Sequence, residues 1–141
     1  ASDVYKRQLL YCSDHGEDIL DDKRERFLHA SPTVTYYQLH IPSLAWFSDY
    51  YAERYPQRVV AAGSNEWAAA TTHSMFHTIA GMASIKSRYV DDSVSLVSDN
   101  FDKTAPRYYL NDHNEAVAFD IQIGLNDDDR QRFAEHDIKM R

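Results

Sequence analysis

The stretch Leu9-Leu10-Tyr11-Cys12-Ser13-Asp14-His15-Gly16-Glu17-Asp18 decides the fold that we predict for this chain. Residues 9–13 are mostly apolar and end at a turn signal, which is typical of a short buried strand. Open α/β sheets collect ligands where their strands end at the carboxyl edge. Gly16 allows a sharp backbone turn there, because it has no Cβ. The sequence therefore predicts a functional turn directly after a central strand.

Composition limits the kind of protein and the kind of partner. The chain has 141 residues, which is the size of one domain with a real core. Its net charge is -7 and no basic stripe could neutralise phosphates, so the sequence argues against nucleic acid. It has no run of about 18 apolar residues, so no membrane span is predicted. The single cysteine, Cys12, lies in the apolar strand, where we expect it to act as a small hydrophobic residue.

The first eight residues differ in character from the rest. This octet, Ala1-Ser2-Asp3-Val4-Tyr5-Lys6-Arg7-Gln8, is polar but abuts a core strand. Its last six residues resemble a translated sequencing adapter, so we exclude residues 1–8 from the fold prediction as a non-native leader. A core strand with nothing native before it predicts a truncated gene, with apolar edges and faces left exposed.

Three further segments near the first strand have clear patterns. Residues 41–47 are nearly all apolar, which predicts a second strand of the main sheet. Asp49 is a suitable N-cap for a short helix through Arg54, which Pro56 would end. Residues 17–26 are dense in charge without a periodic apolar face, so we expect an exposed loop there.

The second half of the chain contains one strong helical pattern. Residues 72–83 repeat apolar residues at helical spacing, and the predicted face consists of Met75, Phe76, Ile79, Ala80 and Met82. Gly81 within this pattern either weakens the helix or marks a close packing contact.

Other segments of the second half carry weaker signals. Residues 57–70 stay ambiguous between loop and helix. Residues 107–110 and 116–123 alternate as strands around the turn-rich residues 111–114, and Asn126 or Asp127 is suited to cap a closing helix.

Asp14 and His15 combine an oxygen ligand with an imidazole, which suits a cation such as zinc. Adjacent residues on a strand point to opposite faces, so these two can share an ion only if the backbone turns at Gly16. From periodicity alone, a capping Asp14 and a hydrogen-bonded His15 are favoured. Glu17 and Asp18 are expected to add local negative charge or to bond backbone amides.

The other histidines have ordinary interpretations from the sequence. His29 lies far enough along a loop to fold back to the same place, although a loop histidine is usually solvated. His40 is expected to orient a loop by hydrogen bonding. His73 and His77 have a spacing that can grip a metal, but no Glu lies between them, so core or surface roles are favoured. His113 is expected to be a turn residue.

Three segments occur in a specific order along the chain. Tyr11-Cys12-Ser13-Asp14-His15-Gly16-Glu17-Asp18 precedes Phe27-Leu28-His29-Ala30, and Gln38-Leu39-His40-Ile41-Pro42-Ser43-Leu44-Ala45-Trp46-Phe47-Ser48-Asp49 follows. Together they resemble the C-terminal part of the sulfatase-like phosphoethanolamine transferases, which belong to the alkaline phosphatase superfamily. The resemblance runs from residue 9 to about residue 85 and more loosely to residue 113. It implies a partial three-layer α/β/α sandwich, with residues 9–141 forming the C-terminal part of the catalytic domain.

The resemblance also implies roles for single residues. In the family, the Asp and His of the Ser-Asp-His-Gly motif ligate the catalytic zinc, and here these are Asp14 and His15. The His of the following Leu-His segment assists a second metal or the phosphate group, and here it is His29. Ala30 stands where the family usually has Gly. The Glu ligand and the Thr nucleophile of the family come from upstream segments that this sequence does not contain.

The activity implied by the resemblance is transfer of phosphoethanolamine through a covalent phosphothreonine, with Zn²⁺ as the cofactor. Phosphatidylethanolamine would be the donor, and lipid A or a core sugar would be the acceptor. The family places the catalytic domain in the periplasm and anchors it to the inner membrane through an N-terminal region absent here. We expect the chain alone to be inactive and to bind zinc weakly, because two adjacent ligands leave the tetrahedral shell half empty.

Two alternatives stay open on the sequence. The first is a fragment of a sulfatase or phosphodiesterase-type hydrolase on the same scaffold, which would differ in its upstream nucleophile. The second is a non-enzymatic α/β module in which Asp14 and His15 only cap a turn. In that module the carboxylate of Asp14 and the imidazoles of His15 and His29 would not converge.

Overall fold

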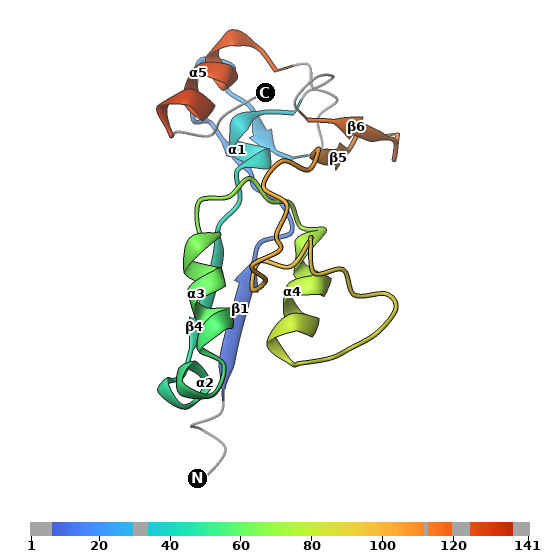
Figure 1. The fold of residues 1–141 in the computed structure, drawn as a ribbon. Coiled ribbons are helices and arrows are strands. Elements are labelled where there is room, and N and C mark those ends of the chain that lie inside the picture. Colours follow the sequence, from blue (N-terminus) through green and yellow to red (C-terminus); the bar gives the residue numbers. More distant parts are fainter. Residues whose placement is uncertain (1–6, 30–33, 112, 120–124, 137–141) are drawn as a thin grey trace. The chain divides into compact units, whose positions relative to one another are not determined.

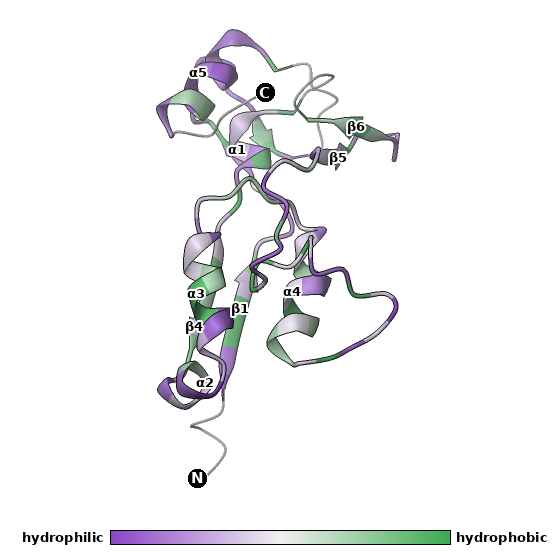
Figure 2. Cartoon of the chain, viewed as in Figure 1, coloured by the Kyte–Doolittle hydropathy of each residue, from purple (hydrophilic) through white to green (hydrophobic). Residues whose placement is uncertain are grey.

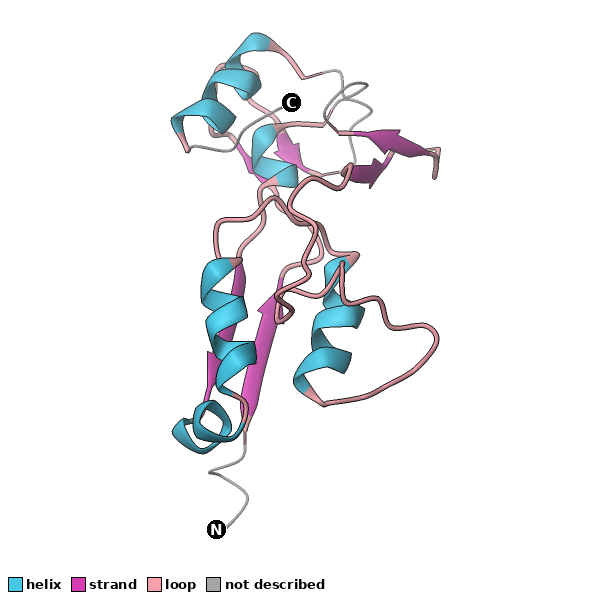
Figure 3. Cartoon of the chain, viewed as in Figure 1, coloured by secondary structure: helices cyan, strands magenta, loops and turns pink. Residues whose placement is uncertain are grey.

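The chain is mixed α/β and consists of short helices and short strands joined by loops (Figure 1, Figure 3). A computed structural model describes residues 7–29, 34–111, 113–119 and 125–136. The chain divides into two compact units, which are residues 1–12 with 43–105 and residues 13–42 with 106–141. Within the described residues, no helix is both long enough and apolar enough to cross a membrane.

The first unit contains a two-stranded antiparallel ribbon and three helices. Its elements are β1 (Gln8–Cys12), β4 (Ser43–Phe47), α2 (Asp49–Arg54), α3 (Pro56–Ser64) and α4 (Ser74–Met82). The register of the ribbon runs from Gln8 opposite Phe47 to Cys12 opposite Ser43. Both predicted strands are therefore confirmed, and the structure pairs them directly with each other. Gln8 from the excluded octet is the first residue of β1.

Capping explains where α2 and α3 begin. Ser48, and not Asp49 as predicted, caps α2, because its side chain accepts a hydrogen bond from the Tyr51 amide at 3.3 Å. Asp49 instead occupies the first turn, where an acidic side chain favours the helix dipole. Pro56 ends α2 as predicted and also begins α3, at a position where its missing N–H costs nothing. The ambiguous segment after Pro56 is thus helical as far as Ser64.

The helix predicted at residues 72–83 is confirmed as α4, but only Ala80 and Met82 of the predicted apolar face are buried. Phe76 and Ile79 are more than half exposed, whereas Ser74 and Thr78 are buried. The polar side is buried because a following loop supplies backbone donors to it, as in the 3.0 Å bond from the Leu96 amide to Thr78 Oγ1. A Cβ at Gly81 would come within 2.9 Å of the side chains of that loop, which confirms the close packing contact.

One face of the β1–β4 ribbon is apolar and open. Leu9 lies opposite Trp46, and Tyr11 lies opposite Leu44. These four side chains are 49%, 53%, 52% and 59% exposed, and Figure 2 shows the hydrophobic character of the ribbon. The expectation that apolar faces are left exposed is confirmed on this ribbon.

The second unit contains two short hairpins and two helices around an aromatic core. Its elements are β2 (Asp18–Ile19), β3 (Phe27–Leu28), α1 (Tyr36–Leu39), β5 (Tyr108–Leu110), β6 (Ala116–Ala118) and α5 (Asp127–Glu135). β2 pairs antiparallel with β3, and β5 pairs antiparallel with β6. In the core, the Phe133 ring lies edge-on to the rings of Tyr36 and Phe119.

The predicted hairpin at residues 107–123 and the predicted closing helix are both present. The hairpin is β5–β6, and residues 120–123 of its second predicted strand lie outside the described residues. Asn126 is the N-cap of α5, since its side chain accepts a hydrogen bond from the Asp129 amide at 2.9 Å.

The charged segment at residues 17–26 is not the exposed loop that we expected. Asp18 in β2 is 3% exposed. Arg24 donates to both carboxylate oxygens of Asp129 on α5, at 2.8 and 2.9 Å, and Asp129 is fully buried. The partners of this pair are 105 residues apart, so local charge density could not reveal it.

Candidate metal centre

The turn after β1 is held against α1 by its backbone. The Gly16 amide donates a hydrogen bond to the Gln38 carbonyl oxygen at 2.9 Å. A Cβ at Gly16 would lie 1.9 Å from the Tyr37 carbonyl oxygen, which no side chain could tolerate. The close approach of two backbone segments therefore requires glycine at this position.

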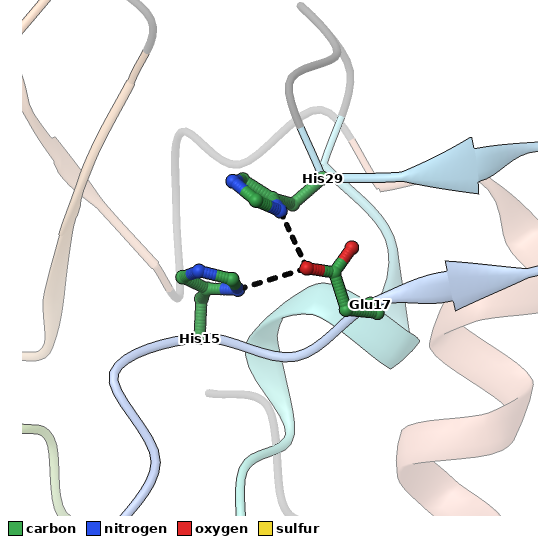
Figure 4. A group of neighbouring side chains, drawn as sticks. All are labelled: His15, Glu17 and His29. Atoms are coloured by element: carbon green, nitrogen blue, oxygen red, sulfur yellow. Dashed lines mark hydrogen bonds and ion pairs between the residues drawn. The ribbon is translucent and has the colours of Figure 1, made fainter.

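His15, Glu17 and His29 gather beside this turn (Figure 4). In the β2–β3 pair Asp18 lies opposite Leu28, so Glu17 and His29 meet one step further along the same two segments. His29 Nδ1 lies 2.6 Å from Glu17 Oε1, and His15 Nδ1 lies 3.5 Å from the same oxygen. The two imidazole rings are 3.8 Å apart between centroids. The structure thus brings the predicted residues His15 and His29 together around one carboxylate.

The oxygens around the two rings define which nitrogen carries the proton. His15 Nδ1 lies 3.0 Å from the Gly16 carbonyl oxygen, and a carbonyl oxygen can only accept. His29 Nδ1 bonds a carboxylate oxygen, which is also an acceptor. In the neutral imidazoles, Nδ1 therefore donates, and Nε2 of each ring keeps a lone pair for a metal or a proton.

Asp14 lies next to His15 but outside the group of three. Its side chain is 89% exposed, and its Oδ1 accepts a hydrogen bond from the His15 amide at 3.1 Å. Its Oδ2 is 3.8 Å from His15 Nε2, the nitrogen that Glu17 does not contact. Asp14 and the free nitrogen of His15 are therefore neighbours, whereas Asp14 and His29 are not joined by any contact within the described residues.

The donor set suits zinc. One ligand atom from each of His15, Glu17 and His29 lies within 4.8 Å of the others, and imidazole nitrogen with carboxylate oxygen is a common zinc ligand set. Glu17 Oε2 is buried and has no hydrogen-bond partner among the described residues. A buried carboxylate oxygen without a donor is the kind of group that a cation satisfies. The chemistry of this group fits Zn²⁺ with Glu17 as a ligand, which is a different arrangement from the Asp14–His15 pair that the family resemblance implies.

Glu17 is the residue that sequence reasoning missed, because it was expected to add only local charge. Asp18 accepts hydrogen bonds from the side chains of Thr35 and Gln38, not from backbone amides as we expected. No periodic signal in the sequence identifies Glu17, because it meets His29 through the pairing of two strands of only two residues each.

Two other histidines, His77 and His40, have structural roles. His77 is buried in α4, and its Nδ1 accepts a hydrogen bond from the Asp91 amide at 3.0 Å. His40 bonds the Tyr36 hydroxyl through Nδ1 at 2.5 Å. Burial lowers the pKa of His40 below its usual value, and neighbouring His136 lowers it further. Of the core or surface roles expected for His77, the structure shows the core one, and the hydrogen-bonding role expected for His40 is confirmed.

Comparison with solved structures identifies the fold. The chain is similar to the C-terminal periplasmic domain of EcEptC from Escherichia coli, with a TM-score of 0.65 and 23% identity. The chain has the fold of the matching part of that domain. A second structure of the domain, a complex with Zn, gives a TM-score of 0.61 and 22% identity. The predicted α/β class is therefore confirmed.

The match covers most of this chain but only a part of each EcEptC chain. It covers 82% and 83% of this chain but only 32% and 34% of the two EcEptC chains. This chain thus spans about a third of the domain that it resembles. Comparison with protein-family models and with curated proteins gave no match.

Proposed function

We propose that this chain is part of a zinc-dependent phosphoethanolamine transferase that modifies lipid A or core oligosaccharide. The observation that carries the proposal is the convergence of His15, Glu17 and His29 directly after β1, in a chain with the fold of the EcEptC periplasmic domain. The order of its sequence motifs and the Zn complex of that domain support the same proposal.

Asp14 and His15 are the proposed zinc ligands of this chain. His15 Nε2 has a free lone pair, and Asp14 Oδ2 lies 3.8 Å from it. The Gly16 carbonyl oxygen accepts from the opposite nitrogen of the ring, Nδ1, at 3.0 Å, as backbone carbonyls commonly do for metal-bound histidines. Bound zinc would supply Lewis-acid activation of a hydroxyl nucleophile and would offset the charge of a phosphoryl group.

His29 is the proposed catalytic residue beside the zinc. Its Nδ1 is engaged with Glu17 at 2.6 Å, so the ring is fixed and Nε2 stays available. That nitrogen can bind a phosphate oxygen or take the proton of an acceptor hydroxyl. The carboxylate of Glu17 would then stabilise the charged imidazolium, as the Asp of a catalytic triad does.

The proposed substrates follow from the same resemblance. Phosphatidylethanolamine would be the donor, and the phosphoryl group would pass through a threonine supplied by another segment of the enzyme. The catalytic domain would work on the periplasmic side of the inner membrane. The chain alone is proposed to be inactive, because it supplies zinc ligands and a histidine but no nucleophile.

The test is modification of lipopolysaccharide by the complete gene product that contains this chain. Mass spectrometry of lipid A and core sugars from a bacterium expressing it should show added phosphoethanolamine. His15→Ala and His29→Ala should abolish that addition, whereas His113→Ala in the β5–β6 turn should not. Absence of the modification, or its persistence in His15→Ala, contradicts the proposal. Release of sulfate or phosphate from ester substrates would instead favour the hydrolase.

A further inference from the structure

We infer that Asp18 is a positioning residue, which holds the segment carrying His15 and Glu17 in the geometry that metal binding needs. The inference rests on the proposed function, because it concerns how the proposed metal centre is held in place. It assigns Asp18 no contact with metal or substrate.

Asp18 is buried among donors that come from α1 and the residue before it. Its carboxylate is 3% exposed and accepts a hydrogen bond from Thr35 Oγ1 at 2.7 Å. The Gln38 side-chain amide donates to its other oxygen. Arg26 Nε lies 3.6 Å away and balances the charge of the buried carboxylate. Asp18 therefore has partners on both oxygens and no need of a further cation.

Gln38 connects α1 to the segment that carries His15 and Glu17 at two points, Gly16 and Asp18. Its carbonyl oxygen accepts the Gly16 amide at 2.9 Å, and its side chain donates to Asp18. Glu17 lies between these two anchored residues, and His15 lies directly before the first of them. The backbone of Glu17 therefore has little freedom, and the bond at Gly16 limits the freedom of the neighbouring His15.

α1 itself is held by buried polar groups at its first turn. It is only four residues long, and a helix of this length has no stability of its own. Thr35 is fully buried and caps it by accepting the Gln38 amide at 3.3 Å. Asp129 Oδ1 accepts the Tyr36 amide at 3.1 Å. The anchor of Asp18 is thus part of the buried framework of the second unit.

The variants that test this role are Asp18→Asn and Gln38→Leu. Asparagine keeps the size of Asp18, but it replaces one of the two accepting oxygens by a donor group and removes the negative charge that faces Arg26. Leucine removes the side-chain donor of Gln38 and keeps the carbonyl that accepts the Gly16 amide. Asp128→Asn is the matched control, because Asp128 is an exposed acid on α5 in the same unit.

Two measurements on the purified chain test whether Asp18 holds the segment that carries His15 and Glu17 in place. The first is titration with Co²⁺ followed by visible absorption, in which Asp18→Asn and Gln38→Leu should weaken binding about tenfold or more. The second is hydrogen exchange in the metal-free chain, in which the Gly16 amide should exchange about tenfold faster in both variants. Amides of the β5–β6 hairpin should keep their wild-type rates, and Asp128→Asn should match wild type in both assays.

The outcomes separate this inference from the proposed function. If the wild-type chain binds no Co²⁺, the proposed metal centre fails, and the Gly16 amide still reports whether Asp18 anchors the segment. The inference is overturned if Asp18→Asn leaves Co²⁺ affinity and Gly16 exchange unchanged. It is also overturned if exchange rises equally at every amide, because Asp18 would then serve stability alone. If Asp18→Asn does not fold, Gln38→Leu decides by the same two measurements.

Discussion

Replacement of Asp129 by alanine should destabilise the second unit strongly. Asp129 is fully buried and accepts three hydrogen bonds from distant groups, two from the Arg24 guanidinium and one from the Tyr36 amide. The substitution leaves the Arg24 guanidinium with Asp22 as its remaining carboxylate partner and leaves the Tyr36 amide without an acceptor. Both consequences disfavour the folded chain.

The expected loss in the free energy of unfolding of Asp129→Ala follows from these contacts. Breaking a buried ion pair by removing one partner costs about 3–5 kcal/mol. Asp22 continues to hold Arg24, which moves the expected loss to the lower end, about 3 kcal/mol. For a unit of this size, such a loss lowers the melting temperature by about 15 °C.

Thermal and urea unfolding followed by circular dichroism provide the assay. Asp128→Ala is the control, because Asp128 is the neighbouring exposed acid, and its removal should cost about 0.5 kcal/mol or less. In a double-mutant cycle, Arg24→Met should change stability much less when Asp129 is already alanine. A loss below about 1 kcal/mol in Asp129→Ala, or additive effects in the cycle, would refute the reasoning.

Two further predictions concern the turn and the acid limit of stability. Gly16→Ala should weaken Co²⁺ binding and lower the melting temperature, because its Cβ would lie 1.9 Å from the Tyr37 carbonyl oxygen. Gly63→Ala, which meets no atom within 4 Å, should be neutral or stabilising, and equal losses in both variants would contradict this. Hydrogen bonding from Arg24 lowers the pKa of Asp22 from 3.8 to about 2. The folded-state pKa lies below the unfolded one, so this contribution, about 2 kcal/mol, is complete above pH 4 and is lost as the pH falls towards 2. Urea unfolding between pH 2 and 5 should show that loss in wild type and a flatter profile in Asp22→Asn.

The main strand pair and the turn could be predicted because their signals are local. Residues 9–13 and 41–47 are continuous apolar runs, and a polar turn with Gly16 follows the first of them. The likeness of the Ser-Asp-His-Gly-Glu segment to a known family pointed to His15 and His29. In the structure the rings of these two histidines lie 3.8 Å apart between centroids. Strong local patterns thus gave the framework on which the site is built.

The residues that the sequence analysis misjudged depend on distant partners. Glu17 meets His29 only because β2 pairs with β3, and strands of two residues carry no periodic signal. Asp18 and Asp129 look like solvated acids in the sequence, yet each is buried by donors from other elements. Part of the buried side of α4 is polar because a loop bonds Thr78, so apolar periodicity found only Ala80 and Met82 on that side.

The central claim is that a zinc ion binds at His15, with Asp14 as its neighbour and Glu17 behind the imidazole. Crystals of this chain grown with zinc and measured at the zinc absorption edge test it most directly. We expect an anomalous peak about 2.0–2.2 Å from His15 Nε2 and from a carboxylate oxygen of Asp14. An anomalous peak at His73 and His77 with none at His15 would contradict the account.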